Sequence, residues 1–243
     1  MKKLFPIILL FSSFITCQSL TSNIDLYKSN IIIIPKDNQL EVKTYVEIFN
    51  RNLQFVKFQD GFKSSYELKI AIIDEDGNRI KEETVSEEII VNNFSETVSQ
   101  SNPKIILNDF IIPKKQFSVN FAVKDLDTKL IGKRQKKFNK KQLPFDEELK
   151  VYEPIFFKFK NGEWGFDSNK YPLSSNQIVS KNNLVEMNQF FEMNKGEYFA
   201  NFSLISEKNE IWNDSVSGNS EGGVESFSFK IPISDAESSN CLL

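Results

Sequence analysis

Hydrophobic and polar residues alternate along most of the chain after its N-terminus. Over residues 40–49 the even positions are apolar or Thr, and the same period of two returns over 66–72. Such a period places successive side chains on opposite faces of a strand. The second run stops at Asp76-Gly77, a pair that favours a tight hairpin turn, and the chain then returns to Val91. We therefore expect residues 40–91 to form one antiparallel sheet with one buried face.

Similar runs lie on both sides of this stretch. Ile31–Ile34 predicts an opening strand that ends at Pro35, because proline has no N–H for the ladder. Asn161-Gly162 is a strong signal for a second hairpin. The other predicted strands cover residues 104–112, 116–124, 155–159, 184–193, 198–205, 210–216 and 224–233.

No segment after the N-terminus carries the 3.6-residue apolar stripe of an amphipathic helix. Short strands separated by frequent turns are typical of sandwiches. The sequence predicts an all-β fold with two consecutive antiparallel β-sandwich (Ig-like) domains after an N-terminal signal segment. Leu143-Pro144, followed by acidic residues, marks the boundary. We expect domain 1 over 31–141, a linker over 142–152 and domain 2 over 153–243.

The first residues have the pattern of an export signal. Lys2 and Lys3 precede an apolar run at 4–15 that is too short to span a bilayer. We therefore expect a signal peptide over 1–19, followed by a polar tether over 20–30.

Two ways of processing this signal stay open. Cys17 is a candidate for lipidation, because Phe14-Ile15-Thr16-Cys17 resembles a bacterial lipobox. Cleavage after Ser19 by ordinary signal peptidase is the alternative. The second cysteine, Cys241, lies too close to the end for a disulfide to close around a core.

The composition excludes several kinds of chemistry. The chain contains no histidine, so it lacks the usual general base of Ser-His-Asp systems and the commonest zinc ligand. A net charge of -3 gives no general attraction to nucleic acid. Asp74, Asp76 and Asn78 imitate part of a calcium loop, but Arg79 stands where that loop needs glycine. We predict no catalytic, cofactor-binding or metal-binding residue, and we expect the glycine-rich stretch 218–223 to be a mobile loop.

Two groups of side chains remain as candidates for binding. Residues 129–141 hold seven cations, which indicate either a surface for a membrane or an acidic partner, or a solvated edge hairpin whose lysines block strand pairing. They are Lys129, Lys133, Arg134, Lys136, Lys137, Lys140 and Lys141. Aromatic residues that could stack on sugar rings are Trp164, Tyr171, Tyr198 and Trp212, although sandwich cores also use such residues.

Five short blocks in the first half carry a resemblance to a known family. The blocks are Leu53–Lys57, Gly61-Phe62, Tyr66–Leu68, Ile73–Gly77 and Phe94–Ser99. In order and spacing they resemble the N-terminal β-domain of bacterial GWxTD domain-containing proteins. The naming Gly-Trp-x-Thr-Asp motif is absent, and Gly162–Asp167 does not match it. The resemblance implies an exported cell-envelope protein and transfers no catalytic residue.

These observations favour a non-enzymatic exported protein of the cell envelope that acts as a protein-interaction or structural module. It would be either an outer-membrane lipoprotein, held to the membrane only through a lipid anchor at Cys17, or a periplasmic or extracellular protein. The expected partner is a protein of the envelope, with a glycan as a possible second ligand and no nucleic acid. A carbohydrate-binding module or a carboxylate-dependent glycan-acting enzyme is the alternative.

Overall fold

The computed structural model describes residues 26–158 except 102, 141, 146 and 147, and also residues 171–172, 178–179, 184–206, 209–232 and 241–242. Within these ranges the helical segments are the four-residue α1 (Phe94–Thr97) and the 3-10 turn η1 (Asn50–Asn52). The rest of the regular structure is strand, so the predicted all-β class is confirmed. The predicted signal peptide lies outside the described residues.

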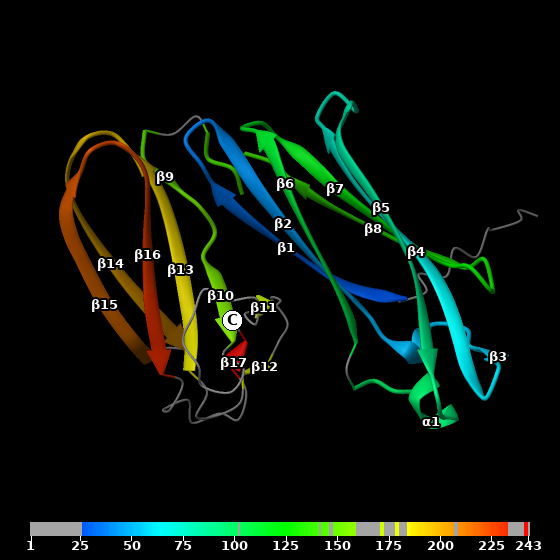
Figure 1. The fold of residues 1–243 in the computed structure, drawn as a ribbon. Helices are drawn as coiled ribbons and strands as arrows, with labels where there is room; N and C mark the ends of the chain where they lie inside the picture. The colour runs from blue at the N-terminus through cyan, green and yellow to red at the C-terminus, as the bar shows by residue number, and fades with distance from the viewer. Residues whose placement is uncertain are drawn as a thin grey trace, which may run out of the picture.

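The first half is a sandwich of two antiparallel sheets (Figure 1). One sheet has three strands in the order β1 (Tyr27–Pro35), β2 (Gln39–Ile48) and β6 (Lys104–Pro113). The other has five strands: β3 (Val56–Phe58), β4 (Gly61–Asp74), β5 (Arg79–Val91), β7 (Phe117–Asp125) and β8 (Ile131–Phe138). In this second sheet β4 pairs with β5 on one side and with β7 on the other, and β8 follows β7.

The expectation of a single sheet over residues 40–91 is wrong. β2 lies in the three-stranded sheet, whereas β4 and β5 lie in the facing sheet, and the chain crosses between them at η1. The alternation correctly indicates that each strand buries one face, but a period of two does not specify which strand lies beside it.

Alternate residues of both sheets form one core between the layers. β2, β4 and β7 contribute the following side chains, all at most 3% exposed: Leu40, Val42, Val46, Ile48, Tyr66, Leu68, Ile70, Ile72, Phe117, Val119, Phe121 and Val123. Leu143 and Tyr152, which the sequence placed in a linker, belong to the same core and are 0% and 3% exposed. β1 begins at Tyr27, inside the stretch predicted as a tether.

The second half also consists of strands. A sheet is formed by β9 (Lys150–Val151), β10 (Ile155–Lys158), β11 (Tyr171–Pro172), β13 (Leu184–Met193) and β16 (Gly223–Pro232). The hairpin of β14 (Gly196–Ser206) and β15 (Asn209–Ser220) packs against it through Phe202 and Trp212, which contact buried Met187 and Phe229. A short separate pair joins β12 (Ile178–Val179) to β17 (Cys241–Leu242).

The glycine-rich stretch 218–223 is not a loop, contrary to expectation. β15 continues to Ser220, which is 1% exposed, and β16 begins at Gly223. Glu221 and Gly222 alone connect the two strands, and Gly222 has a φ of +94°, which favours glycine. This connection leads from the β14–β15 hairpin into the sheet that contains β13 and β16.

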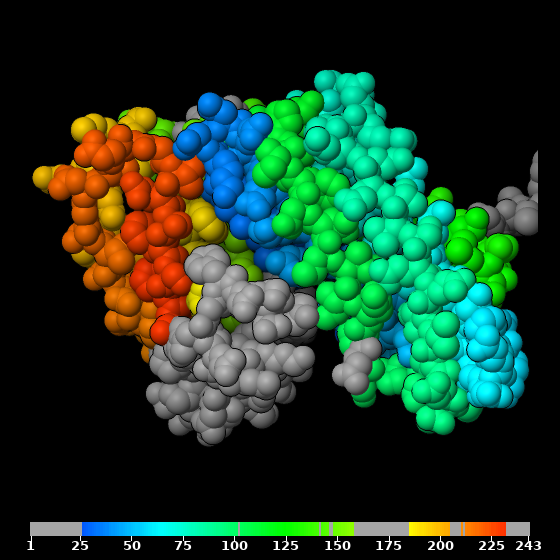
Figure 2. Space-filling model, in the orientation of Figure 1, coloured from blue at the N-terminus to red at the C-terminus, as the bar shows by residue number. Residues whose placement is uncertain are grey.

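The two halves contact each other through β13, which lies beside β1 (Figure 1; Figure 2). Phe190 of β13 packs against the core of the first half. Glu192, two residues further on the same face, accepts hydrogen bonds from Lys114 at 2.6 Å, Lys150 at 2.7 Å and the Tyr152 hydroxyl at 3.1 Å. A single carboxylate therefore joins the β6–β7 turn, β9 and β13.

Candidate binding edge

β8 is the last strand of its sheet, and the turn before it is held by one carboxylate. Asp125 ends β7 and is 2% exposed. It accepts hydrogen bonds from the backbone N–H groups of Gln54 at 2.7 Å, Asp127 at 2.8 Å and Thr128 at 3.0 Å. Side chains of this kind commonly fix turns by accepting nearby backbone N–H groups. The turn directs the chain back along β7 as a hairpin, and β8 has no strand on its other side within the described residues.

Near each end of β8 one residue is buried, and the middle of the strand is charged. Gly132 and Phe138 are buried, and the Phe138 ring stacks on Phe117 with centroids 5.0 Å apart. Between them Arg134 and Lys136 occupy the two other positions that face the opposite sheet. Charged residues pointing inward on an edge strand are a known protection against edge-to-edge pairing. The basic stretch thus contains an edge strand, as predicted, while the role of its cations stays a prediction; Lys141 lies outside the described residues.

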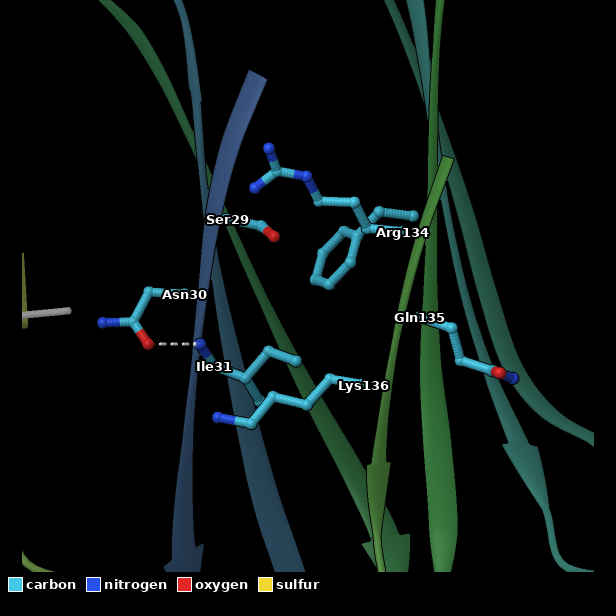
Figure 3. A pocket seen from close by; sticks show the side chains of 7 residues that line it. Ser29, Asn30, Ile31, Arg134, Gln135 and Lys136 are labelled. Atoms are coloured by element: carbon cyan, nitrogen blue, oxygen red, sulfur yellow. Dashed lines mark hydrogen bonds between the residues drawn. The ribbon is translucent and has the colours of Figure 1, made fainter. Parts of the chain in front are cut away.

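β1, the edge strand of the facing sheet, lies opposite β8. A groove of about 240 Å³ runs between the two strands, and its lining includes Ser29, Ile31 and Phe121. Figure 3 shows Arg134 and Lys136 reaching across this groove toward β1, while Gln135 points to the other face of the sheet. The groove is therefore cationic on one wall and partly apolar on the other.

The free edge of β1 is partly closed by its own side chain. The Asn30 Oδ1 accepts a hydrogen bond from the N–H of Ile31 at 2.8 Å, and Asn30 points away from the groove (Figure 3). This N–H is consequently used within β1. The free edge of β1 therefore offers one backbone donor fewer to a pairing strand, whereas the inward charges protect the edge of β8.

Arg134 has a defined position over Tyr27. Its guanidinium carbon lies 5.3 Å from the centroid of the Tyr27 ring, a geometry that favours a cation–π interaction. The Tyr27 hydroxyl donates to the carbonyl of Phe121 at 3.2 Å, which ties β1 to β7. Burial raises the pKa of Tyr27 far above its usual value despite the opposing charge of Arg134, so this hydroxyl stays protonated and keeps donating at neutral pH.

The lysines of β8 lack acidic neighbours. Within the part of the chain that the structure describes, no carboxylate pairs with Lys133, Lys136 or Lys137. By contrast, Lys69 of β4 pairs with Glu82, and Lys104 of β6 pairs with Glu87. The positive charge of these three lysines is therefore not neutralised by a described carboxylate and remains available to a negatively charged partner.

The other predicted candidates are placed as follows. Cys17 and Trp164 lie outside the described residues, and the side chain of Tyr171 is not described. Trp212 makes an edge contact with Phe229 at 5.5 Å, and Tyr198 lies 5.7 Å from Phe227, so both rings pack on the core of the second half. Tyr198 and Trp212 therefore do not form an exposed sugar-binding platform.

The acidic turn between β4 and β5 is the predicted hairpin. Asp74 accepts hydrogen bonds from the Lys115 amine at 2.7 Å and from the N–H of Asn78 at 2.7 Å, and Gly77 has a φ of +86°. The carboxylate oxygens of Asp74 are thus engaged in closing the turn. No group of three acidic or cysteine residues suited to a metal occurs in the described ranges.

No protein-family model matches the chain, and no curated protein matches it either. The resemblance to GWxTD domain-containing proteins consequently stays a prediction. Among the residues that the structure describes, no helix is long and apolar enough to cross a bilayer.

The β1 wall of the groove was missed by the sequence reasoning, because Ser29 and Ile31 carry no chemical signal of their own. The β8 wall could have been found. A period of two places Arg134 and Lys136 on the same face of the strand as Gly132 and Phe138. Since Gly132 and Phe138 are buried, the two charges face the opposite sheet.

Proposed function

We propose that this chain is a non-enzymatic, exported protein of the cell envelope that binds an acidic segment of a partner protein along β8. The observation that carries the proposal is the run of four cations in β8, at the free edge of a sheet, with Lys133, Lys136 and Lys137 having no carboxylate among the described residues. Uncompensated charge at an edge selects a partner of opposite sign.

The same charges discriminate between partners. A second copy of β8 would bring lysines against lysines, which is unfavourable, so the edge resists self-association. An acidic extended segment instead gains ion pairs along the strand and can use the unpaired backbone groups of the edge. The groove toward β1 gives side chains of such a segment a place beside Ser29 and Ile31.

The location follows from the predicted export signal. Lipidation of Cys17 would hold the folded part near the outer membrane through acyl chains, whereas cleavage after Ser19 would release it. Either form leaves β8 available to a partner in the envelope. A glycan-binding role is the second candidate, and the hollow described in the next section favours it.

Site-specific photo-crosslinking tests the proposal in cells that produce the full chain. Ile131 lies on β8 and is 44% exposed, and Ile90 lies on β5, at the opposite edge of the same sheet, and is 59% exposed. Each is replaced in turn by p-benzoylphenylalanine, which leaves the charge unchanged. We expect a discrete protein adduct from position 131 and none from position 90.

Charge reversal provides the decisive second arm. With Lys133→Glu and Lys137→Glu added, the adduct from position 131 should disappear while the protein level stays the same. An adduct that survives charge reversal, equal adducts from both positions, or adducts to lipid alone would each overturn the proposal.

A further inference from the structure

The outer face of the five-stranded sheet contains a hollow of about 570 Å³ on the side of β8 opposite the groove. Its floor includes Ala71 of β4 and Ala122 of β7, which present only methyl groups between longer neighbours. A volume of this size falls in the usual range of small-ligand sites, roughly 300–1,000 Å³.

Strand register explains why the hollow is lined by polar groups. Across β4, β7 and β8, Ala71 stands opposite Asn120, which stands opposite Gln135. In the neighbouring row the order is Lys69, Ala122 and Lys133. The two alanines are therefore diagonal neighbours, with cations in one row and amides in the other.

Two of these groups have unused hydrogen-bonding capacity. The Asn120 Oδ1 is enclosed and has no hydrogen-bond donor among the described residues. An enclosed acceptor without a donor is costly, typically about 1–3 kcal/mol, so turning the Asn120 amide toward the hollow, where a ligand hydroxyl could donate to it, would recover this cost. Lys133, which lies diagonally from Asn120 on β8, has no acidic partner in the described part of the chain.

The charge around the hollow is positive. Glu82 is the one carboxylate among the lining residues, and it already accepts from Lys69 at 3.0 Å and Arg79 at 2.6 Å. These bonds neutralise Glu82 and hold the two cations at the β4–β5 side. The Lys133 amine lies at the β8 side, so a carboxylate on a ligand meets positive charge from both sides of the hollow.

We propose that this hollow binds a uronate unit of an acidic glycan. Such a ligand supplies hydroxyl donors for the Asn120 oxygen and a carboxylate for Lys133, and a sugar ring can rest on the alanine floor. The aromatic side chain nearest in sequence, Phe121, is buried in the core on the other face, so charge and hydrogen bonds must carry recognition. Neutral sugars, which rely on stacking against aromatic rings, should bind poorly. The proposal does not depend on the partner protein of β8.

Calorimetric titration of the whole exported chain with trigalacturonate tests the site. Galactotriose is the neutral probe, and a glutamate trimer is the peptidic carboxylate probe. We expect saturable binding of trigalacturonate at least tenfold tighter than binding of either of the other two, and weaker binding as salt increases.

Variants locate the binding. Lys133→Gln and Asn120→Leu should each weaken binding of trigalacturonate at least tenfold, and Ala122→Phe should abolish it by filling the floor without changing the charge. Lys63→Gln is the matched control, because Lys63 lies on the same sheet, outside the hollow, and pairs with Glu88 at 2.9 Å. It should bind like the unaltered chain.

Thermal unfolding separates loss of the site from loss of the fold. Lys133 is exposed, so Lys133→Gln should melt at the same temperature as the unaltered chain. Absence of saturable trigalacturonate binding, unchanged binding by Lys133→Gln, or equal binding of the glutamate trimer would overturn the proposal. None of these results depends on the crosslinks from position 131.

Discussion

Replacing Glu192 by Gln tests whether one carboxylate holds the two halves of the chain together. The side chain of Glu192 is 18% exposed, and those of Lys114 and Lys150 are 14% and 21% exposed. Glutamine keeps the shape but leaves both ammonium groups without a counter-charge in a partly buried place.

The expected cost lies between two limits. Breaking a buried ion pair costs about 3–5 kcal/mol, whereas exposed pairs contribute about 0–1 kcal/mol. Because these side chains are mostly but not fully buried, we expect about 2–3 kcal/mol for Glu192→Gln. For a chain of this size that loss lowers the melting temperature by roughly 4–12 °C.

Urea denaturation at pH 7 measures this cost, with Glu221→Gln as the matched control. Glu221 also pairs with a lysine, Lys195, but the two side chains are 83% and 71% exposed. The control should cost less than about 1 kcal/mol. If Glu192→Gln destabilises no more than Glu221→Gln, the reasoning from burial is refuted.

The same carboxylate predicts a pH dependence. Burial alone would raise the pKa of Glu192, but hydrogen bonds from Lys114 and Lys150 outweigh it and hold the pKa below its usual value. A depressed pKa stabilises the folded chain above the ordinary glutamate pKa of about 4.3, and this stability is lost as the pH falls through the folded-state value. The stability difference between the unaltered chain and Glu192→Gln should therefore shrink as the pH is lowered below about 4.3.

Three further substitutions have defined outcomes. Asp125→Ala removes the acceptor of three backbone N–H groups and should cost roughly 3 kcal/mol in urea denaturation. Gly61→Ala places a Cβ 2.4 Å from the carbonyl oxygen of Val91, so the β4–β5 pairing must shift and the chain should lose roughly 2 kcal/mol or more. Arg134→Thr with Lys136→Thr removes the inward charges of β8 and should produce dimers or larger species in analytical ultracentrifugation.

Each of these predictions has a control. Asp127→Ala removes an exposed carboxylate whose single bond to the N–H of Ser65 is 3.3 Å long, and should cost less than Asp125→Ala. Gly77→Ala meets no atom within 4 Å, so its cost comes only from its φ of +86° and should be smaller than that of Gly61→Ala. Lys63→Thr with Lys69→Thr removes two cations of β4, which has strands on both sides, and should leave the chain monomeric. The reasoning would be contradicted if either control cost more stability than the substitution that it is paired with. It would also be contradicted if the variant Arg134→Thr with Lys136→Thr stayed monomeric.

Strand positions could be predicted from the sequence because burial on one face imposes a period of two. The predicted strand 184–193 coincides with β13, and 104–112 differs from β6 by one residue. The pairing of strands could not be predicted, since β2 and β4 carry the same alternation yet lie in opposite sheets.

Of the two candidate sites, one could be predicted from the sequence and the other could not. The basic wall at β8 is visible in the sequence as charges between Gly132 and Phe138. The hollow on the other face is not, because Ala71, Asn120 and Lys133 become neighbours only through the register of three strands. Alanines in a strand carry no chemical signal until long side chains are known to surround them.

The burial of Leu143 and Tyr152 has a consequence for the order of folding. The core of the first sandwich includes both side chains, and the N–H of Tyr152 donates to the carbonyl of Phe190 at 3.1 Å. A fragment that stops at residue 141 would therefore lack part of its own interior and should be less stable than one that continues past Tyr152. If the chain is exported N-terminus first, as proposed, the first sandwich stays incompletely packed until Tyr152 emerges. The last packing step of this sandwich then coincides with the arrival of the strands of the second half.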